Sequence, residues 1–333
     1  MFALKSKYFA NMKSKANFQL TPFRPPYHLR NPHLQSIYAG IFLKGNFVKY
    51  RRERLITPDQ DFFDIDIVDG QGPAVIACHG FEGSSSSTHI TRLMTLIQKL
   101  GWCGYAINYR SCSGEINDTF YTYNAGKTED LEQLIWHVHK QNSSRPIFLV
   151  GYSFGANILA NCISRPKFDL PKIAASALIS GNYRIEPGVI AMSKGFSRVY
   201  EQSFVSSLID KYKLKKSKFP NEIDYNAFFE SKTLYELDER ITAPYFNFSS
   251  ASEFYNEISS AVYLRKINHP TFMLNSLDDP LSPPACFPSV EELSSPLLNF
   301  HTTKKGGHVA FLSRDISYWL EKQIIRWFLF NIN

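Results

Sequence analysis

The sequence predicts an α/β fold, a mostly parallel, doubly wound sheet interrupted by an inserted segment. Short apolar runs alternate with stretches of helical periodicity in two parts of the chain, residues 47–181 and 269–333. Strands that are apolar throughout are typical of a parallel sheet covered on both faces. Residues 182–268 lack this alternation, and an interruption of that length inside a regular sheet predicts a cap or lid.

The predicted elements follow one another in a regular order. Residues 47–70 predict two strands, with a turn at Pro58 and Asp59. Further along, each short apolar run predicts a buried strand, and apolar residues three or four apart predict a helix. The predicted strands are 73–80, 103–110, 145–153, 172–181, 269–280 and 296–308, and the predicted helices are 87–101, 127–141, 155–164 and 317–330.

The composition is that of a globular protein. Hydrophobic residues make up 44% and charged residues 20% of the 333 residues. No uninterrupted apolar run approaches the roughly 18 residues that span a bilayer, and the N-terminus has no apolar core typical of a secretory signal. The five cysteines are scattered without a Cys-x-x-Cys motif, which predicts neither a zinc site nor a disulfide framework. A cytoplasmic location is the simplest expectation.

The positive charge is concentrated in the N-terminal part. Residues 1–54 carry a net charge of +10, so the rest of the chain carries −3. Residues 1–46 are therefore expected to form a basic arm that packs on the core. Such an arm could contact an anionic membrane peripherally, or it could be a solvated tail. Nucleic acid is not an expected partner, because no recognition motif accompanies the charge.

A Gly-x-Ser-x-Gly motif lies where a predicted strand meets a predicted helix. In "IFLVGYSFGANIL", Ser153 is flanked by Gly151 and Gly155. A turn between strand and helix is too tight for side chains at both flanks, so the glycines leave room while the serine hydroxyl is exposed at the carboxyl edge of the sheet. This context predicts a nucleophile.

A serine nucleophile needs a base and an acid, and both follow later strands. "LNSLDDPLSP" supplies Asp278 and Asp279, and "KKGGHVAFL" supplies His308. The order Ser…Asp…His is that of an α/β-hydrolase. His308 would accept the serine proton, and the aspartate would orient the imidazole. Asp279 is favoured because Pro280 suits the exit from a strand, while Asp278 remains the alternative acid.

Two backbone N–H groups are expected to stabilise the oxyanion. One belongs to Phe154, directly after the nucleophile. The other is expected in "CHGFEGS", where His79 and Gly80 end a strand and the N–H of Phe81 follows. Each such donor is typically worth about 10²–10³ in turnover.

With these motifs in place, the sequence resembles the YheT-like branch of the α/β-hydrolase superfamily. The resemblance extends from about residue 22 to residue 327. It is carried by "PFRPPYHLRNPHLQSIY", "HGFEGSSSS", "NYRSCSGEIN", "GYSFGANIL", "LNSLDDPLSP" and "GGHVAFL". It implies an α/β-hydrolase fold, a Ser153–Asp279–His308 triad and esterase or lipase-like activity without a metal or other cofactor. The residues of the segment "RNPHLQS", taken alone, predict a polar loop.

Three positions depart from the usual pattern of this branch. Ser111 and Ala156 stand where glycines are common, and Asn124 stands where a histidine is common. The side chains of Ser111 and Ala156 are expected to narrow the substrate pocket. They would therefore change which substrate the pocket accepts more than the reaction itself.

The sequence thus predicts a serine hydrolase that cleaves a small-molecule carboxylic ester through an acyl-enzyme. Aromatic residues in "YNAFFE" and "PYFNF" are expected to wall a pocket for an apolar acyl chain. The same triad could serve an acyltransferase or a thioesterase. A hypothesis of a different class is a non-catalytic binding or scaffold protein with this fold.

Overall fold

An eight-stranded sheet forms the centre of the molecule. A computed structural model of the chain describes residues 18–43 and 48–332. The strand order in the sheet is β1-β2-β4-β3-β5-β6-β7-β8. The strands are β1 (Arg51–Ile56), β2 (Phe62–Val68), β3 (Ala74–Cys78), β4 (Cys103–Asn108), β5 (Ile147–Tyr152), β6 (Ala175–Ile179), β7 (Thr271–Ser276) and β8 (Leu298–Thr303).

Most of the sheet is parallel, as predicted. Strands β4, β3, β5, β6, β7 and β8 pair in parallel, whereas β1 pairs with β2 and β2 with β4 in antiparallel register. Every residue of β3, β5, β6 and β7 is buried. Their carboxyl ends meet at one edge, where ligands of parallel sheets bind.

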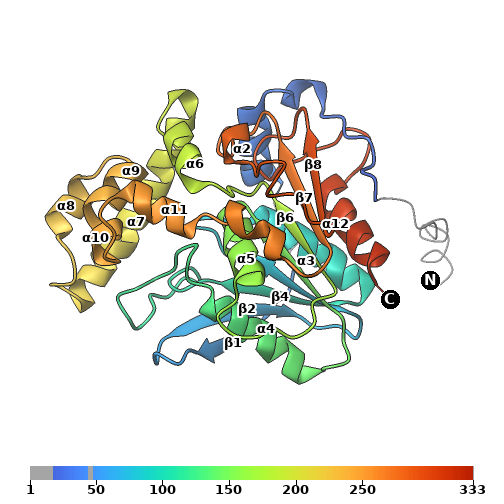
Figure 1. Cartoon of the computed structure of the whole chain (residues 1–333), viewed down its shortest axis with the longest axis horizontal. Coiled ribbons are helices and arrows are strands. Elements are labelled where there is room, and N and C mark those ends of the chain that lie inside the picture. The colour runs from blue at the N-terminus through green and yellow to red at the C-terminus, as the bar shows by residue number, and fades with distance from the viewer. Residues whose placement is uncertain (1–17, 44–47, 333) are drawn as a thin grey trace.

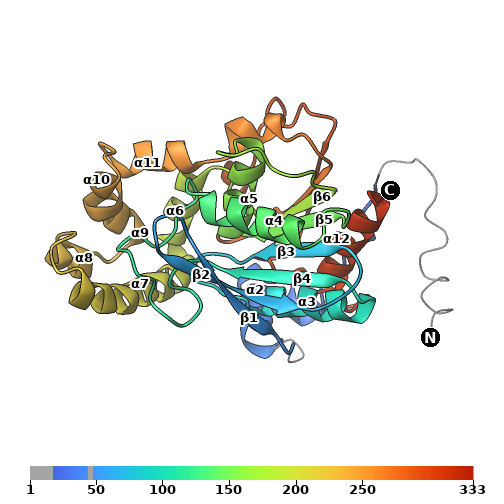
Figure 2. The same cartoon turned by 90° about the horizontal axis from the view of Figure 1, so that it is seen from below.

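Helices cover both faces of the sheet (Figures 1 and 2). One apolar core lies between the sheet and α4 (Glu129–Gln141) and α5 (Phe154–Ser164), which contribute Leu134 and Leu159. The other lies between the sheet and α3 (Thr88–Leu100) and α12 (Trp319–Phe330), which contribute Leu93 and Phe328. This is the doubly wound arrangement that the alternation of strands and helices predicts.

The segment between β6 and β7, residues 182–268, is helical, and we call it the inserted segment. Figure 1 shows α7 to α10 gathered at one end of the molecule, beyond α5 and α6. Its elements are α6 (Ile185–Met192), η2 (Gly195–Ser197), α7 (Arg198–Lys218), α8 (Tyr225–Glu230), α9 (Leu234–Leu237), η3 (Asp238–Thr242), α10 (Ala243–Tyr245), α11 (Ala251–Ile258) and η4 (Ala261–Lys266). Two short 3₁₀ turns, η1 (Tyr27–Leu29) and η5 (Pro284–Cys286), lie outside it.

The segment "RNPHLQS" forms the start of a helix, so its interpretation as a polar loop was wrong. Helix α2 spans Pro32–Phe42, and the side chain of Asn31 accepts hydrogen bonds from the backbone N–H groups of His33 and Leu34. An asparagine cap followed by proline at the first position is a standard helix start.

The first part of the predicted basic arm, residues 1–17, lies outside the described residues, and so does the proposed membrane contact through it. Within residues 18–43 and 48–332, no helix combines the length and apolar character that crossing a bilayer requires.

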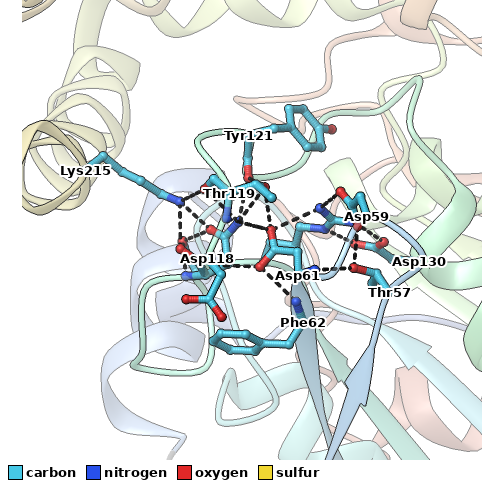
Figure 3. A network of polar contacts seen from close by, with 12 residues as sticks. Thr57, Asp59, Asp61, Phe62, Asp118, Thr119, Tyr121, Asp130 and Lys215 are labelled. Carbon is cyan, nitrogen blue, oxygen red and sulfur yellow. Dashed lines mark hydrogen bonds and ion pairs between the residues drawn. The ribbon is translucent and has the colours of Figure 1, made fainter. Parts of the chain in front are cut away.

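A buried polar network joins the inserted segment to the sheet (Figure 3). The ammonium of Lys215, on α7, donates to Asn117 Oδ1 at 2.7 Å and to the carbonyl oxygen of Thr119 at 2.5 Å. The hydroxyl of Thr119 donates to Asp61 at 2.6 Å, and Arg110 donates to the same carboxylate at 3.1 Å. Because Lys215 and Asp61 are both fully buried, we infer that this network fixes how α7 sits on the sheet.

We expect Lys215→Met to destabilise the protein, because the acceptors of the lysine would stay buried without a donor. Each such group costs about 1–3 kcal/mol, or a few degrees in Tm. Burial lowers the pKa of Lys215 from 10.5 to about 7. Between these two pH values the unfolded chain binds more protons than the folded chain. The free energy of unfolding should therefore rise with pH across that window in the wild type.

Urea unfolding of Lys215→Met between pH 7 and 10 checks this prediction. Lys213→Met is the control, because Lys213 lies on the same helix, is exposed and forms an exposed ion pair with Asp210. If Lys215→Met and Lys213→Met had the same free energy of unfolding at every pH, the predicted destabilisation by Lys215→Met would be contradicted.

Candidate active site

Ser153 occupies a sharp turn between β5 and α5. Its backbone has φ 55° and ψ −124°, and a positive φ of this kind is rare for a residue with a side chain. The turn is held by a hydrogen bond from the N–H of Ser153 to the carbonyl oxygen of Ile179, at 2.8 Å. A strained backbone of this kind is typical of functional turns.

The two glycines of the motif have no space for a side chain. A Cβ atom on Gly151 would lie 2.5 Å from the carbonyl oxygen of Gly155. On Gly155 it would lie 2.2 Å from the carbonyl oxygen of His79. These neighbours are backbone atoms that cannot rotate away, so the turn requires glycine at both positions.

The structure brings Ser153, His308 and Asp279 together at the carboxyl edge of the sheet. His308 Nε2 lies 2.7 Å from Ser153 Oγ. His308 Nδ1 lies 3.0 and 2.9 Å from the two carboxylate oxygens of Asp279. Asp279 Oδ1 also accepts from the N–H groups of Leu281 and Ser282, both at 2.9 Å. The carboxylate is thus fixed in place, and Nδ1 of His308 must carry a proton while Nε2 is free to accept one.

Asp278 points elsewhere. Its Oδ1 accepts hydrogen bonds from the hydroxyl of Ser276 and, at 3.1 Å, from the N–H of Gly307. Its Oδ2 lies 3.6 Å from the ammonium of Lys305. Asp278 therefore holds the loop in front of His308 and does not contact the imidazole.

Helix α2 supports the same loop from behind. The hydroxyl of Ser36 accepts from the N–H of His308 and donates to the carbonyl oxygen of Pro32, both at 2.8 Å. Gln35, fully buried, accepts from the N–H of Leu312 at 3.0 Å. Reasoning from the residues missed both side chains. The available signal was a pair of polar residues inside the segment most characteristic of the family resemblance.

We expect Ser36→Ala to lower kcat by about 10- to 100-fold, because a small misplacement of a catalytic group costs up to that much. We expect Ser36 to position His308 without contacting the substrate, so KM and Tm should change little. Steady-state ester hydrolysis checks this. Ser217→Ala is the control, since Ser217 also donates to a carbonyl of its own helix but is exposed. An unchanged kcat would mean that the loop positions His308 without the hydrogen bond to Ser36.

The loop after β3 lies against the serine. A Cβ atom on Gly80 would be 3.1 Å from Ser153 Cβ. Burial lowers the pKa of His79 to about 4, so its ring is neutral at pH 7. Its Nδ1 donates to the carbonyl oxygen of Gly80 at 2.7 Å, while Nε2 accepts from the N–H of Tyr109 at 3.3 Å. Fixing that carbonyl also fixes the N–H of Phe81, because the two groups share one planar peptide.

A second set of contacts fixes the next peptide and involves the inserted segment. The N–H of Glu82 donates to the hydroxyl of Tyr123 at 2.8 Å. The Glu82 carboxylate accepts from Lys211 at 2.7 Å and Ser207 at 2.6 Å, both on α7. The N–H groups of Phe81 and Phe154 have no hydrogen-bond partner among the described residues. They remain available to a ligand oxygen. No local sequence pattern indicates the contacts from α7.

An apolar pocket opens beside Ser153 and runs under the inserted segment. Its empty space, including the open mouth, is about 1200 Å³. Its walls include the predicted aromatic residues Phe228, Tyr245 and Phe246. A lining of mostly apolar and aromatic side chains is typical of sites for small organic ligands.

Ser111 and Ala156 do not belong to the walls of this pocket, so the expectation that they narrow it was wrong. Ser111 has φ 62°, which explains why glycine is common there, and its hydroxyl donates to Asn117. Ala156 is fully buried inside α5. Asn124 does line the pocket, and its Oδ1 accepts from the N–H groups of Gly126 and Lys127.

Comparison with known proteins gives consistent matches. The family model of the alpha/beta hydrolase fold matches residues 73–315. The chain is 31% identical over 316 residues to the putative esterase YheT of Escherichia coli (strain K12), and the alignment covers 92% of each chain. It is 26% identical over 283 residues to Phospholipase ABHD3 of Homo sapiens, covering 80% of this chain and 67% of that relative.

A solved structure has the same fold. The Pyrococcus furiosus esterase Pf2001 superimposes with a TM-score of 0.54 at 16% identity, over 95% of this chain and 97% of that chain. At this identity the likeness concerns the fold alone. Taken with the family model and the YheT relative, it means that this chain belongs to the α/β-hydrolase family, in its YheT-like branch.

Proposed function

We propose that the protein is a serine esterase that cleaves carboxylic esters through an acyl-enzyme on Ser153. The observation that carries the proposal is the continuous chain of contacts from Ser153 Oγ through His308 to Asp279, with separations of 2.7 Å and 2.9–3.0 Å. A relative named as an esterase and another named as a phospholipase support ester hydrolysis as the reaction class.

Each residue has a distinct role in the proposed reaction. Ser153 Oγ attacks the ester carbonyl carbon while its proton passes to His308 Nε2. Asp279 stabilises the imidazolium that forms. The oxyanion accepts hydrogen bonds from the N–H groups of Phe81 and Phe154. The alcohol then leaves with the proton from His308, and water repeats these steps on the acyl-enzyme to release the acid and restore Ser153.

We propose that the inserted segment acts as a cap over an α/β-hydrolase core formed by residues 47–181 and 269–333. The pocket under it is lined mostly by apolar and aromatic side chains, so it suits an acyl chain better than a charged group. The buried ion pair of Lys211 and Glu82 ties this cap to the loop that carries Phe81.

A series of p-nitrophenyl esters from acetyl to palmitoyl tests the proposal. We expect kcat/KM to rise with acyl length, because each buried methylene contributes about 0.8 kcal/mol, and to fall once the chain exceeds the pocket. If every ester were hydrolysed no faster with the protein than in buffer alone, the proposal would be contradicted.

A further inference from the structure

One charged residue lines the apolar pocket. Among the described residues of its wall, Asp238 alone carries a formal charge at neutral pH. Its neighbours in that wall include Leu234, Leu237 and Ile241. The esterase reaction proposed above makes no use of this carboxylate, so its presence in an apolar wall needs another explanation.

Asp238 and Ser153 line the same pocket from different elements of the chain. Asp238 begins η3, which connects α9 to α10, and both helices lie at the end of the molecule away from α5 (Figures 1 and 2). Ser153 lies at the start of α5. A chain attached to Ser153 that fills the pocket would therefore extend toward Asp238.

The surroundings of Asp238 leave part of its carboxylate free. Tyr255, on α11, donates its hydroxyl to Asp238 Oδ2 at 2.7 Å. No cation among the described residues pairs with Asp238, since Arg240 on the same turn contacts Glu230 at 3.5 Å. A carboxylate can accept about four hydrogen bonds, so capacity for a further donor remains.

Two features suggest that this arrangement is functional. Burial raises the pKa of Asp238 to about 6, which means that the site disfavours the charged form and gains from a donor supplied by a ligand. The residues Asp238–Thr242 form a π-helical turn. Such turns are rare and often occur at functional sites.

We propose that Asp238 binds a hydrogen-bond donor at the distal end of the acyl chain, a hydroxyl or an ammonium group. The inference rests on the proposed esterase function and narrows its substrate class to esters of ω-substituted fatty acids. A terminal methyl would fill the same space but leave the carboxylate without this partner. Sites built to hydrogen-bond a substrate group discriminate strongly against analogues that lack it.

The test compares p-nitrophenyl esters of plain, ω-hydroxy and ω-amino acids from six to twelve carbons. At the length that reaches Asp238, we expect kcat/KM to favour the hydroxy or amino chain over the plain chain by at least about tenfold. The ratio of kcat/KM for the ω-hydroxy and ω-amino esters of equal length then shows which of the two donors Asp238 prefers. Asp238→Leu should reverse the preference, and Asp238→Asn should weaken it for the amino chain most, because the charge is lost while an acceptor oxygen remains.

Tyr255→Phe is the control for the alternative that Asp238 has only a structural role, as the partner of Tyr255. It removes the internal hydrogen bond of Asp238 but leaves the carboxylate, so the preference for a donor should persist. If Asp238 only anchors Tyr255, the wild type will show the same kcat/KM for plain and substituted chains at every length, and the inference is wrong. Hydrolysis of plain esters that depends on Ser153 would still support the esterase in that case.

A binding measurement keeps the inference testable if no ester is cleaved. Calorimetry with Ser153→Ala compares the Kd of each ω-hydroxy acid with that of its plain counterpart. Tighter binding of the hydroxy acid, lost in the double variant with Asp238→Leu, supports the inference. Equal Kd values at all lengths overturn it.

Discussion

Replacement of Ser153 by alanine is expected to lower kcat for ester hydrolysis by about 10⁴–10⁶-fold. The hydroxyl oxygen at 2.7 Å from His308 Nε2 is the atom that forms the covalent bond in the proposed reaction, and alanine has no atom in its place. Because alanine fits the same backbone and removes only one oxygen, Tm should stay close to that of the wild type.

The comparison uses one ester at several enzyme concentrations. Activity that remains above about one part in a thousand and scales with the variant would mean that the measured hydrolysis does not depend on Ser153. Ser164→Ala is a control, because Ser164 is a buried serine at the end of the same helix and has no role in the proposed reaction.

The second large effect distinguishes the two adjacent aspartates. Asp279→Asn is expected to lower kcat by about 10⁴-fold. An asparagine would keep its oxygen on the N–H groups of Leu281 and Ser282 and turn its amide toward His308. The amide would then donate to Nδ1 and leave the proton on Nε2, which could no longer accept the proton of Ser153.

Asp278→Asn provides the matched control, with the same change of charge one residue away. Its oxygen would still accept from the N–H of Gly307, so we expect a loss of less than about tenfold, as for a residue that only positions a loop. Equal losses in the two variants, or the larger loss in Asp278→Asn, would contradict the assignment of Asp279 as the acid partner of His308.

Local patterns were sufficient to predict the sheet and the position of the serine. Strands β3, β5, β6 and β7 are buried throughout. Because a strand buried on both faces consists mostly of apolar residues, each one stands out in the sequence as a short apolar run. The glycines around Ser153 were predictable for a related reason, because a tight turn excludes side chains.

The inserted segment resisted prediction because its longest helix, α7, lacks a clear periodicity of apolar residues. Helix α7, with 21 residues, buries Glu201, Lys211 and Lys215, which a sequence pattern places on the solvent side. Each is buried because of a partner far away in the chain, such as Glu82 for Lys211. Ion pairs and hydrogen bonds between distant segments leave no local signal.

The same reason applies to the supports of the proposed site. Ser36 is separated from His308 by 272 positions, and its hydrogen bond to that residue exists only in the folded chain. Asp238 resembles any acidic residue after a short helix until the walls of the pocket are known. The position of the Gly-x-Ser-x-Gly motif was therefore predictable, whereas the distant residues that contact the proposed site were not.

The central claim is that Ser153 forms the covalent bond with the substrate, and trapping that bond tests it most directly. A fluorophosphonate ester reacts irreversibly with a serine that an adjacent base activates. After incubation and proteolysis, mass spectrometry should find one phosphonyl group per chain, on the peptide that contains Ser153, and none on Ser153→Ala. Modification of another residue, or an unmodified wild type under conditions that label a known serine esterase, would contradict the account.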